Sequence, residues 1–152
     1  MIQRIQTLYL LVAGIFPAIS LFVPLVVFSE GARWASMSAF GCESALVQEL
    51  AGFHPYGLFV FTLWASLSAL YAIFGYKNRK SQIKKVYLTI VFNVIWYVAL
   101  GAYTYSVSER IGLGYTFTIS ALLPIIALIA LFLALKSIRK NEALVRAADR
   151  IR

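Results

Sequence analysis

Four runs of mostly apolar residues alternate with short polar segments along the chain. The runs cover residues 7–28, 55–76, 86–108 and 111–135, and they contain no Asp, Glu, Lys, Arg or His. As helices they would extend about 33 Å or more at ~1.5 Å per residue, which is enough to cross the hydrocarbon core of a bilayer. The pattern therefore predicts an all-α membrane protein built as a bundle of four transmembrane helices.

Two prolines interrupt the first run. Pro17 and Pro24 are seven residues apart, so both are expected on the same face of a single helix over residues 7–28. Proline is tolerated in membrane helices when neighbouring groups satisfy the freed carbonyls. We therefore expect this helix to be bent and to continue through Phe28.

The polar segment 29–54 is long enough to form a small cap outside the membrane. Residues 33–40 alternate loosely between polar and apolar positions, which favours a strand, and residues 43–50 show helical spacing. The pattern leaves open whether the cap is strand or helix, and the strand is preferred. Residues 104–108 and 114–118, on either side of the short turn at Glu109 and Arg110, are expected to pair above the membrane.

Lysine and arginine are unevenly distributed between the polar segments. The amino end holds one of the fourteen, the turn at residues 77–85 holds five and the tail at residues 136–152 holds six, whereas the two remaining loops hold one each. Because basic residues accumulate on the cytoplasmic side, both termini and the turn at 77–85 are predicted to be cytoplasmic.

Composition limits the other possibilities. Apolar residues make up 61% of the chain and charged residues 13%, about half the share of a soluble domain. The net charge of +8 comes from residues that flank the apolar runs, so anionic lipid headgroups are the expected partner and nucleic acid is not. A single cysteine, Cys42, and a single histidine, His54, exclude an intrachain disulfide and a cysteine metal cluster.

The predicted spans lack the ionisable residues that usually mark proton relays and ion paths, which argues against a proton-coupled pump. They also lack the bases used in hydrolysis. Residues 81–84 match the short S-x-x-K pattern of some acyl enzymes, but without companion motifs we interpret the match as chance. Roles for Cys42 and His54 stay open. No catalytic residue, cofactor or metal site is predicted.

Asn93 is the most polar residue at mid-membrane depth. Thr89, Asn93 and Tyr97 are spaced by four and share a helix face, and Thr116, Ser120 and Pro124 are predicted to share another. A substrate-contacting amide is one interpretation of Asn93. We favour polar contacts between helices for Asn93, Thr89 and Ser120, since such contacts typically contribute about 0.6 kcal/mol.

The tail beyond the fourth run is predicted to be a helix. Leu144, Ala148 and Ile151 lie on one side of it, and two acids are mixed with its basic residues. A charge signal for topology does not require such a stripe, so we expect the tail to dock on a protein. The predicted docking residues are Lys80, Lys84 and Lys85 in the turn and Leu144, Arg146, Asp149 and Arg150 in the tail.

The two ends of the chain resemble a known family. The opening MIQRIQTLYL and the closing KNEALVRAADRIR look like the terminal motifs of small four-span bacterial inner-membrane proteins that are catalogued only as a domain of unknown function. Asn141 stands where an acid is expected. The resemblance implies a four-span fold and an important cytoplasmic tail, and it implies no reaction, substrate or site residue.

Two functions remain after these observations. The first is a non-enzymatic accessory or scaffolding subunit of an inner-membrane complex, docked through the basic turn and the C-terminal helix, with another membrane protein or a second copy as partner. The alternative is a small transporter or lipid-binding protein with a neutral, aromatic-rich cavity lined by Trp64, Trp96, Tyr97 and Asn93.

Overall fold

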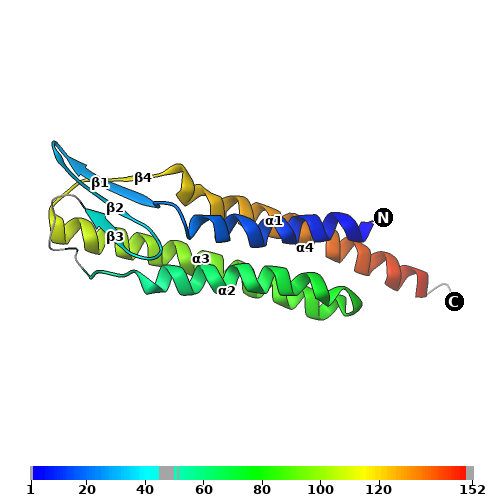
Figure 1. The fold of residues 1–152 in the computed structure, drawn as a ribbon. Coiled ribbons are helices and arrows are strands. Elements are labelled where there is room, and N and C mark those ends of the chain that lie inside the picture. Colours follow the sequence, from blue (N-terminus) through cyan, green and yellow to red (C-terminus); the bar gives the residue numbers. More distant parts are fainter. Residues whose placement is uncertain (1, 45–49, 51, 150–152) are drawn as a thin grey trace.

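A computed structural model describes residues 2–44, 50 and 52–149. Within these residues, four long helices lie side by side and successive helices run in opposite directions, with a small sheet at one end (Figure 1). The helices are α1 (Ile2–Ser20), α2 (Tyr56–Ile73), α3 (Arg79–Ile111) and α4 (Leu123–Asp149). Short 3-10 turns follow α2 (Phe74–Lys77) and precede α4 (Ile119–Leu122).

The sheet has four antiparallel strands in the order β3-β2-β1-β4. Their bounds are Val26–Glu30 (β1), Arg33–Met37 (β2), Cys42–Ser44 (β3) and Tyr115–Phe117 (β4). The strand predicted within residues 33–40 is therefore present as β2. Residues 43 and 44 belong to β3 and not to the helix predicted over 43–50, and residues 45–49 of that prediction lie outside the described residues.

The prediction of one helix over residues 7–28 is wrong, because α1 ends at Ser20 and β1 begins at Val26. Pro24 lies between them. Proline disfavours helical backbone at the residue before it, and the following Val26, Val27 and Phe28 fit a pleated surface. Only Pro17 lies inside the helix, so the two prolines share no helix face.

The pairing predicted between residues 104–108 and 114–118 is also wrong. Residues 104–108 belong to α3, which continues to Ile111 and ends at Gly112 in the left-handed conformation (φ 63°). Gly112 is suited to this position because it has no Cβ. Strand β4 pairs with β1, with Phe28 opposite Tyr115 and Val26 opposite Phe117.

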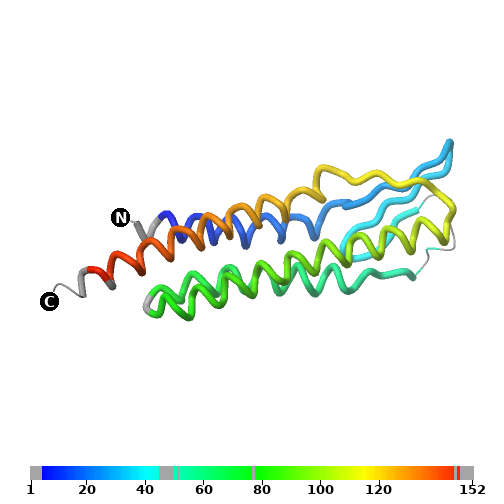
Figure 2. The backbone as a smooth tube through the Cα atoms, turned by 180° about the vertical axis from the view of Figure 1, so that it is seen from behind, coloured from blue at the N-terminus to red at the C-terminus, as the bar shows by residue number. Residues whose placement is uncertain are grey.

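Alternation along the strands places one face of the sheet in the core. Val26 and Phe28 of β1 face Met37 and Ala35 of β2, and all four side chains are fully buried. They belong to the same hydrophobic cluster as Trp96, Leu100 and Val107 of α3. The sheet therefore covers the part of α3 that lies beyond the ends of α1 and α4, as Figure 2 shows from the other side.

Helices α1 and α4 are the most extensively packed pair, followed by α2 with α3 and α1 with α2. Their shared core is rich in alanine, with Ala13 on α1, Ala69 and Ala72 on α2, and Ala127, Ala130 and Ala134 on α4. Small residues allow helix backbones to approach closely when no hydrophobic driving force acts between them in lipid. The packing leaves no room for a side chain at Gly14, where a Cβ would lie 2.8 Å from the Leu70 side chain.

Three helical segments in the described part of the chain are long and apolar enough to cross a membrane, namely Tyr56–Tyr76, Arg79–Ile111 and Ile119–Val145. Residues Ile5–Ser20 form a shorter apolar helix. The chain thus has the composition and helix lengths of a membrane protein.

Candidate functional site

The basic segment at residues 77–85 is mostly helical. Asn78 caps α3, since its side-chain oxygen accepts a hydrogen bond from the Ser81 backbone N–H at 3.1 Å. The Gln82 amide donates to the Ala72 carbonyl of α2 at 3.0 Å, which ties the two helices together at this end. Lys80 and Lys84 are exposed on the helix surface. Lys85 instead turns toward α2, where its ammonium lies 3.6 Å from the centre of the Tyr71 ring.

Two arginine contacts join the start of α3 to α4. The Arg79 guanidinium donates to the Asn141 carbonyl at 2.7 Å. In the opposite direction, the Arg139 guanidinium of α4 donates to the Tyr87 hydroxyl of α3 and lies 5.6 Å from the centre of the Tyr87 ring. Both acceptors are neutral, so these contacts position the two cations without cancelling their charge. No local sequence signal predicted these contacts, which join residues more than fifty positions apart.

Helix α4 continues past this junction without a break. In both ribbon and tube views its C-terminal part extends beyond the other three helices (Figures 1 and 2). Leu144 and Val145 are exposed there, at 52% and 43%. Of the other predicted docking residues, Arg150 and the side chains of Arg146 and Asp149 lie outside the described part of the structure.

The polar residues predicted to join helices make different contacts. The Thr89 hydroxyl lies 2.8 Å from the Ser68 hydroxyl, so it joins α3 to α2, and it also donates to the Lys85 carbonyl at 2.9 Å. The Asn93 side chain is 1% exposed, and its amide nitrogen donates to the Thr89 carbonyl one turn back in its own helix. That bond is within α3 and not between helices.

Ser120 joins two connecting segments rather than two helices. Its hydroxyl donates to the Pro24 carbonyl at 2.8 Å, and the Thr118 hydroxyl lies 2.6 Å from the same oxygen. Because Thr116 belongs to strand β4, the predicted helix face of Thr116, Ser120 and Pro124 is wrong. Thr118 was not predicted to matter, although a threonine just before a helical run is a recognisable start signal.

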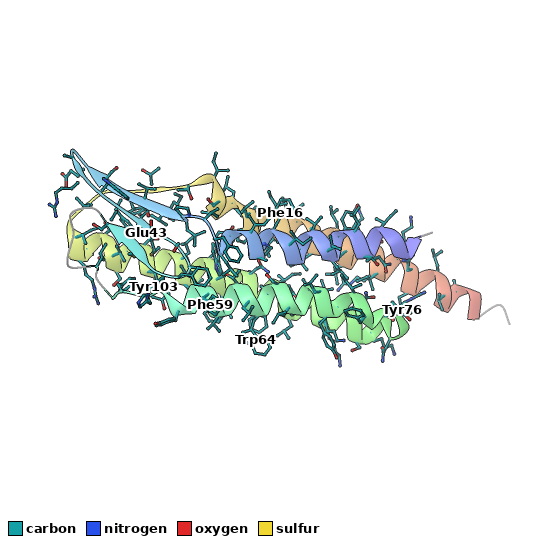
Figure 3. The ribbon with its side chains drawn as sticks, viewed as in Figure 1. Phe16, Glu43, Phe59, Trp64, Tyr76 and Tyr103 are labelled. Carbon is teal, nitrogen blue, oxygen red and sulfur yellow. The ribbon has the colours of Figure 1, made fainter. Side chains whose placement is uncertain are left out.

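The aromatic residues proposed to line a cavity do not share one environment. Trp64 is 56% exposed, stacks on Phe92 of α3 and lies on the outside of the bundle (Figure 3). Trp96 is 1% exposed, and its indole N–H has no hydrogen-bond partner among the described residues. Tyr97 lies beside Trp96 and its hydroxyl donates to the Ala121 carbonyl at 2.8 Å.

The two residues with open roles lie in the cap. Cys42 begins β3, and burial raises the pKa of its thiol to about 11. The His54 ring nitrogen Nδ1 lies 2.9 Å from the Phe40 carbonyl, so it serves as the donor in the tautomer that carries a proton there. In the described ranges, no three His, Cys, Asp or Glu side chains gather as metal ligands would. The contact between His54 and the Phe40 carbonyl joins the segment before α2 to the segment between β2 and β3.

Comparison with known proteins relates the whole chain to one family. No curated protein matches the sequence. The sequence model of the family described as a domain of unknown function, DUF4293, matches residues 2–151. The chain therefore belongs to the DUF4293 family.

Proposed function

We propose that the chain spans the bacterial inner membrane four times, with both termini and the α2–α3 turn in the cytoplasm. The apolar part of α1, Ile5–Ser20, is shorter than the other three apolar helical segments. Its residues Ile5, Leu8 and Ile15 are 43% to 58% exposed, as expected for lipid contact. Twelve of the fourteen basic residues belong to the amino end, the segment 77–85 and the tail. In the described structure, these segments lie at the same end of the bundle (Figure 1). This asymmetry supports the orientation through the positive-inside rule.

The function that we infer is a non-enzymatic accessory or scaffolding subunit that docks a protein partner at its cytoplasmic end. The observation that carries this inference is the projection of α4. A helix that leaves the bundle with Leu144 and Val145 exposed presents apolar surface outside the region that lipid would cover. Apolar residues at adjoining positions of an exposed helix suit a groove on another protein.

A pull-down tests this proposal. An affinity tag inserted after Gly31, at the exposed tip of the β1–β2 hairpin, leaves the tail free, and mild detergent preserves membrane complexes. We expect a membrane protein to co-purify at fixed stoichiometry with the native chain and to be lost with Leu144→Glu. Leu144→Met keeps an apolar side chain and should retain the partner.

Ala143→Glu provides a charge-matched control, since Ala143 is exposed on the same helical turn but on a different face. Equal loss of the partner in the Ala143 and Leu144 variants would mean that added negative charge, not the apolar side chain, is responsible. Recovery of the native chain alone or as a homo-oligomer would reject docking of another protein.

A second candidate function is a small transporter or lipid-binding protein. It is supported by buried polar atoms without partners in the described structure, namely Trp96 Nε1, Ser66 Oγ and Thr104 Oγ1. Such atoms are costly unless they meet water or a ligand. If a ligand satisfies the Trp96 indole, Trp96→Phe should abolish ligand retention. An unchanged set of co-purified small molecules would argue against this function.

A further inference from the structure

Four cationic residues and one tyrosine flank the contact between α3 and α4 at the cytoplasmic end of the bundle. We call this surface the α3/α4 seam and define it by Lys80, Lys84, Tyr87, Lys136 and Arg139. All five side chains are exposed. The contact between Arg139 and the Tyr87 hydroxyl fixes the seam, because it places the basic turns of the two helices next to each other.

Helical spacing places an apolar strip directly below these cations. On α3, Val91, Val94 and Val98 follow Lys84 and Tyr87 on the same side and are 50%, 51% and 68% exposed. On α4, Phe132 lies one turn before Lys136 and is 58% exposed. The seam thus combines cations at headgroup depth with apolar side chains at acyl-chain depth on both helices.

The charge at the seam exceeds what one phosphodiester can neutralise. Lys80, Lys84, Lys136 and Arg139 carry four positive charges. The acids nearest in sequence are Glu109, at the opposite end of α3, and Glu142, one turn beyond Arg139, so that these four cations and Glu142 together carry a net charge of 4 − 1 = +3. A phosphodiester carries one negative charge, so two of them match the seam better than one.

We propose that the α3/α4 seam binds an anionic membrane phospholipid that carries two phosphodiester groups. The cations contact the phosphates, the Tyr87 ring lies between the two helices' charges, and the acyl chains follow Val91, Val94 and Phe132. Basic surfaces between membrane helices on the cytoplasmic side are known to take such headgroups. The apolar strip favours a lipid over an acidic protein. The inference rests on the membrane orientation proposed above and not on the docking of a protein by the tail.

The test uses the purified full chain in detergent, analysed by native mass spectrometry with added lipids. The probes are diphosphatidylglycerol, phosphatidylglycerol and phosphatidylethanolamine. The seam variant is Lys136→Gln combined with Arg139→Gln. The matched control is Arg33→Gln combined with Arg110→Gln, which removes the same charge from exposed positions at the other end of the molecule. Size exclusion and circular dichroism establish that each variant is folded.

The native chain is expected to retain one diphosphatidylglycerol in preference to the other two lipids. Removing two cations should weaken this binding roughly 10- to 30-fold, and the matched control should change it less than about twofold. Equal retention of the one-phosphate and two-phosphate lipids, or equal weakening in both variants, would overturn the proposal.

Further measurements distinguish a failure of the lipid-binding proposal from a failure of the proposed function. Extraction of the chain from membranes by alkaline carbonate would contradict the proposed membrane insertion. A chain that resists carbonate but shows no lipid preference would contradict the seam alone. Loss of the protein partner in the Leu144 variant, with lipid binding intact, would show that the tail and the seam act independently.

Discussion

Gly14 is a position at which α1 packs closely against α2. A Cβ at this position would lie 2.8 Å from Cγ and Cδ2 of Leu70 and 3.4 Å from the Ser66 carbonyl oxygen. Leu70 and Ser66 therefore occupy the space that any larger residue needs. The absence of a side chain sets the distance between these two helices.

Gly14→Ala is expected to lower the free energy of unfolding by about 1 to 3 kcal/mol, because the added methyl overpacks a dense interface. Gly101→Ala is the matched control. Gly101 lies in α3, and a Cβ added there would meet no atom of the described residues within 4 Å, so alanine should be neutral or stabilise by up to about 1 kcal/mol. Unfolding in detergent followed by circular dichroism measures both. Equal changes in the two variants would contradict the tight contact at Gly14.

Cys42 is expected to react slowly with alkylating reagents. Burial raises the pKa of its thiol from 9.0 to about 11, so the reactive thiolate is scarce at neutral pH. The alkylation rate should rise about tenfold per pH unit up to about pH 11. A rate that levels off near pH 9, as it should in the denatured chain, would contradict this prediction. Because the folded state holds the proton more tightly, Cys42 favours folding less as the pH rises from 9 to 11.

The elements meet at one joint between the helices and the sheet. Helices α1 and α4 are neighbours, and β1, which follows α1, pairs with β4, which precedes α4. The connecting segments are held by Thr118, whose N–H donates to the Leu25 carbonyl, and by the hydroxyls of Thr118 and Ser120 at the Pro24 carbonyl. Because both hydroxyls reach the Pro24 carbonyl oxygen, either one can donate to it when the other is removed.

Thr118→Val and Ser120→Ala are expected to act together. Each single variant leaves one hydroxyl on the Pro24 carbonyl and should cost less than about 1 kcal/mol. The double variant removes both donors and should cost about 1 to 3 kcal/mol, more than the sum of the single variants. Unfolding in detergent gives the three values. Thr116→Val, at an exposed position in β4, is the control and should be nearly neutral. If the cost of the double variant equals the sum of the two single variants, the hydroxyls of Thr118 and Ser120 do not share the Pro24 carbonyl.

At the scale of the whole molecule, the two ends of the bundle differ both in charge and in structure. The basic end holds both termini and the α2–α3 turn, and the other end holds the sheet (Figure 1). Helix α3 has 33 residues, about 50 Å at ~1.5 Å per residue, and is longer than a ~30 Å hydrocarbon core requires. The excess length lies on the sheet side, where β1 and β2 pack on it.

Labelling of single cysteines in intact bacterial cells tests the proposed orientation. In a Cys42→Ser background, Glu30→Cys should react with a membrane-impermeant maleimide. Lys80→Cys and Lys140→Cys should react only after the membrane is opened. Immediate labelling of Lys80→Cys with protection of Glu30→Cys would mean that the orientation is inverted.

The second and third apolar helices and the basic end could be predicted from local sequence, because each depends on residues close together in the chain. The fourth predicted helix, residues 111–135, is wrong in its first part, since β4 occupies Tyr115–Phe117 and α4 begins at Leu123. Residues 55–76 and the helical tail are examples, and α4 is helical through Asp149. The candidate surface was predicted only in part. Lys80, Lys84 and Leu144 were named from charge and spacing, but the contact between Arg139 and Tyr87 joins positions 52 residues apart.

The sequence by itself determined which segments are apolar enough for lipid and which end is basic, since both properties follow from the kinds of residue in each segment. Only the tertiary structure decided that the first apolar run divides into α1 and β1. An apolar run satisfies burial equally well as helix or strand, and the strand is favoured because β2 and β4 supply its backbone hydrogen bonds. The α3/α4 seam likewise depends on tertiary structure, because helix packing brings together two basic segments that are distant in the sequence.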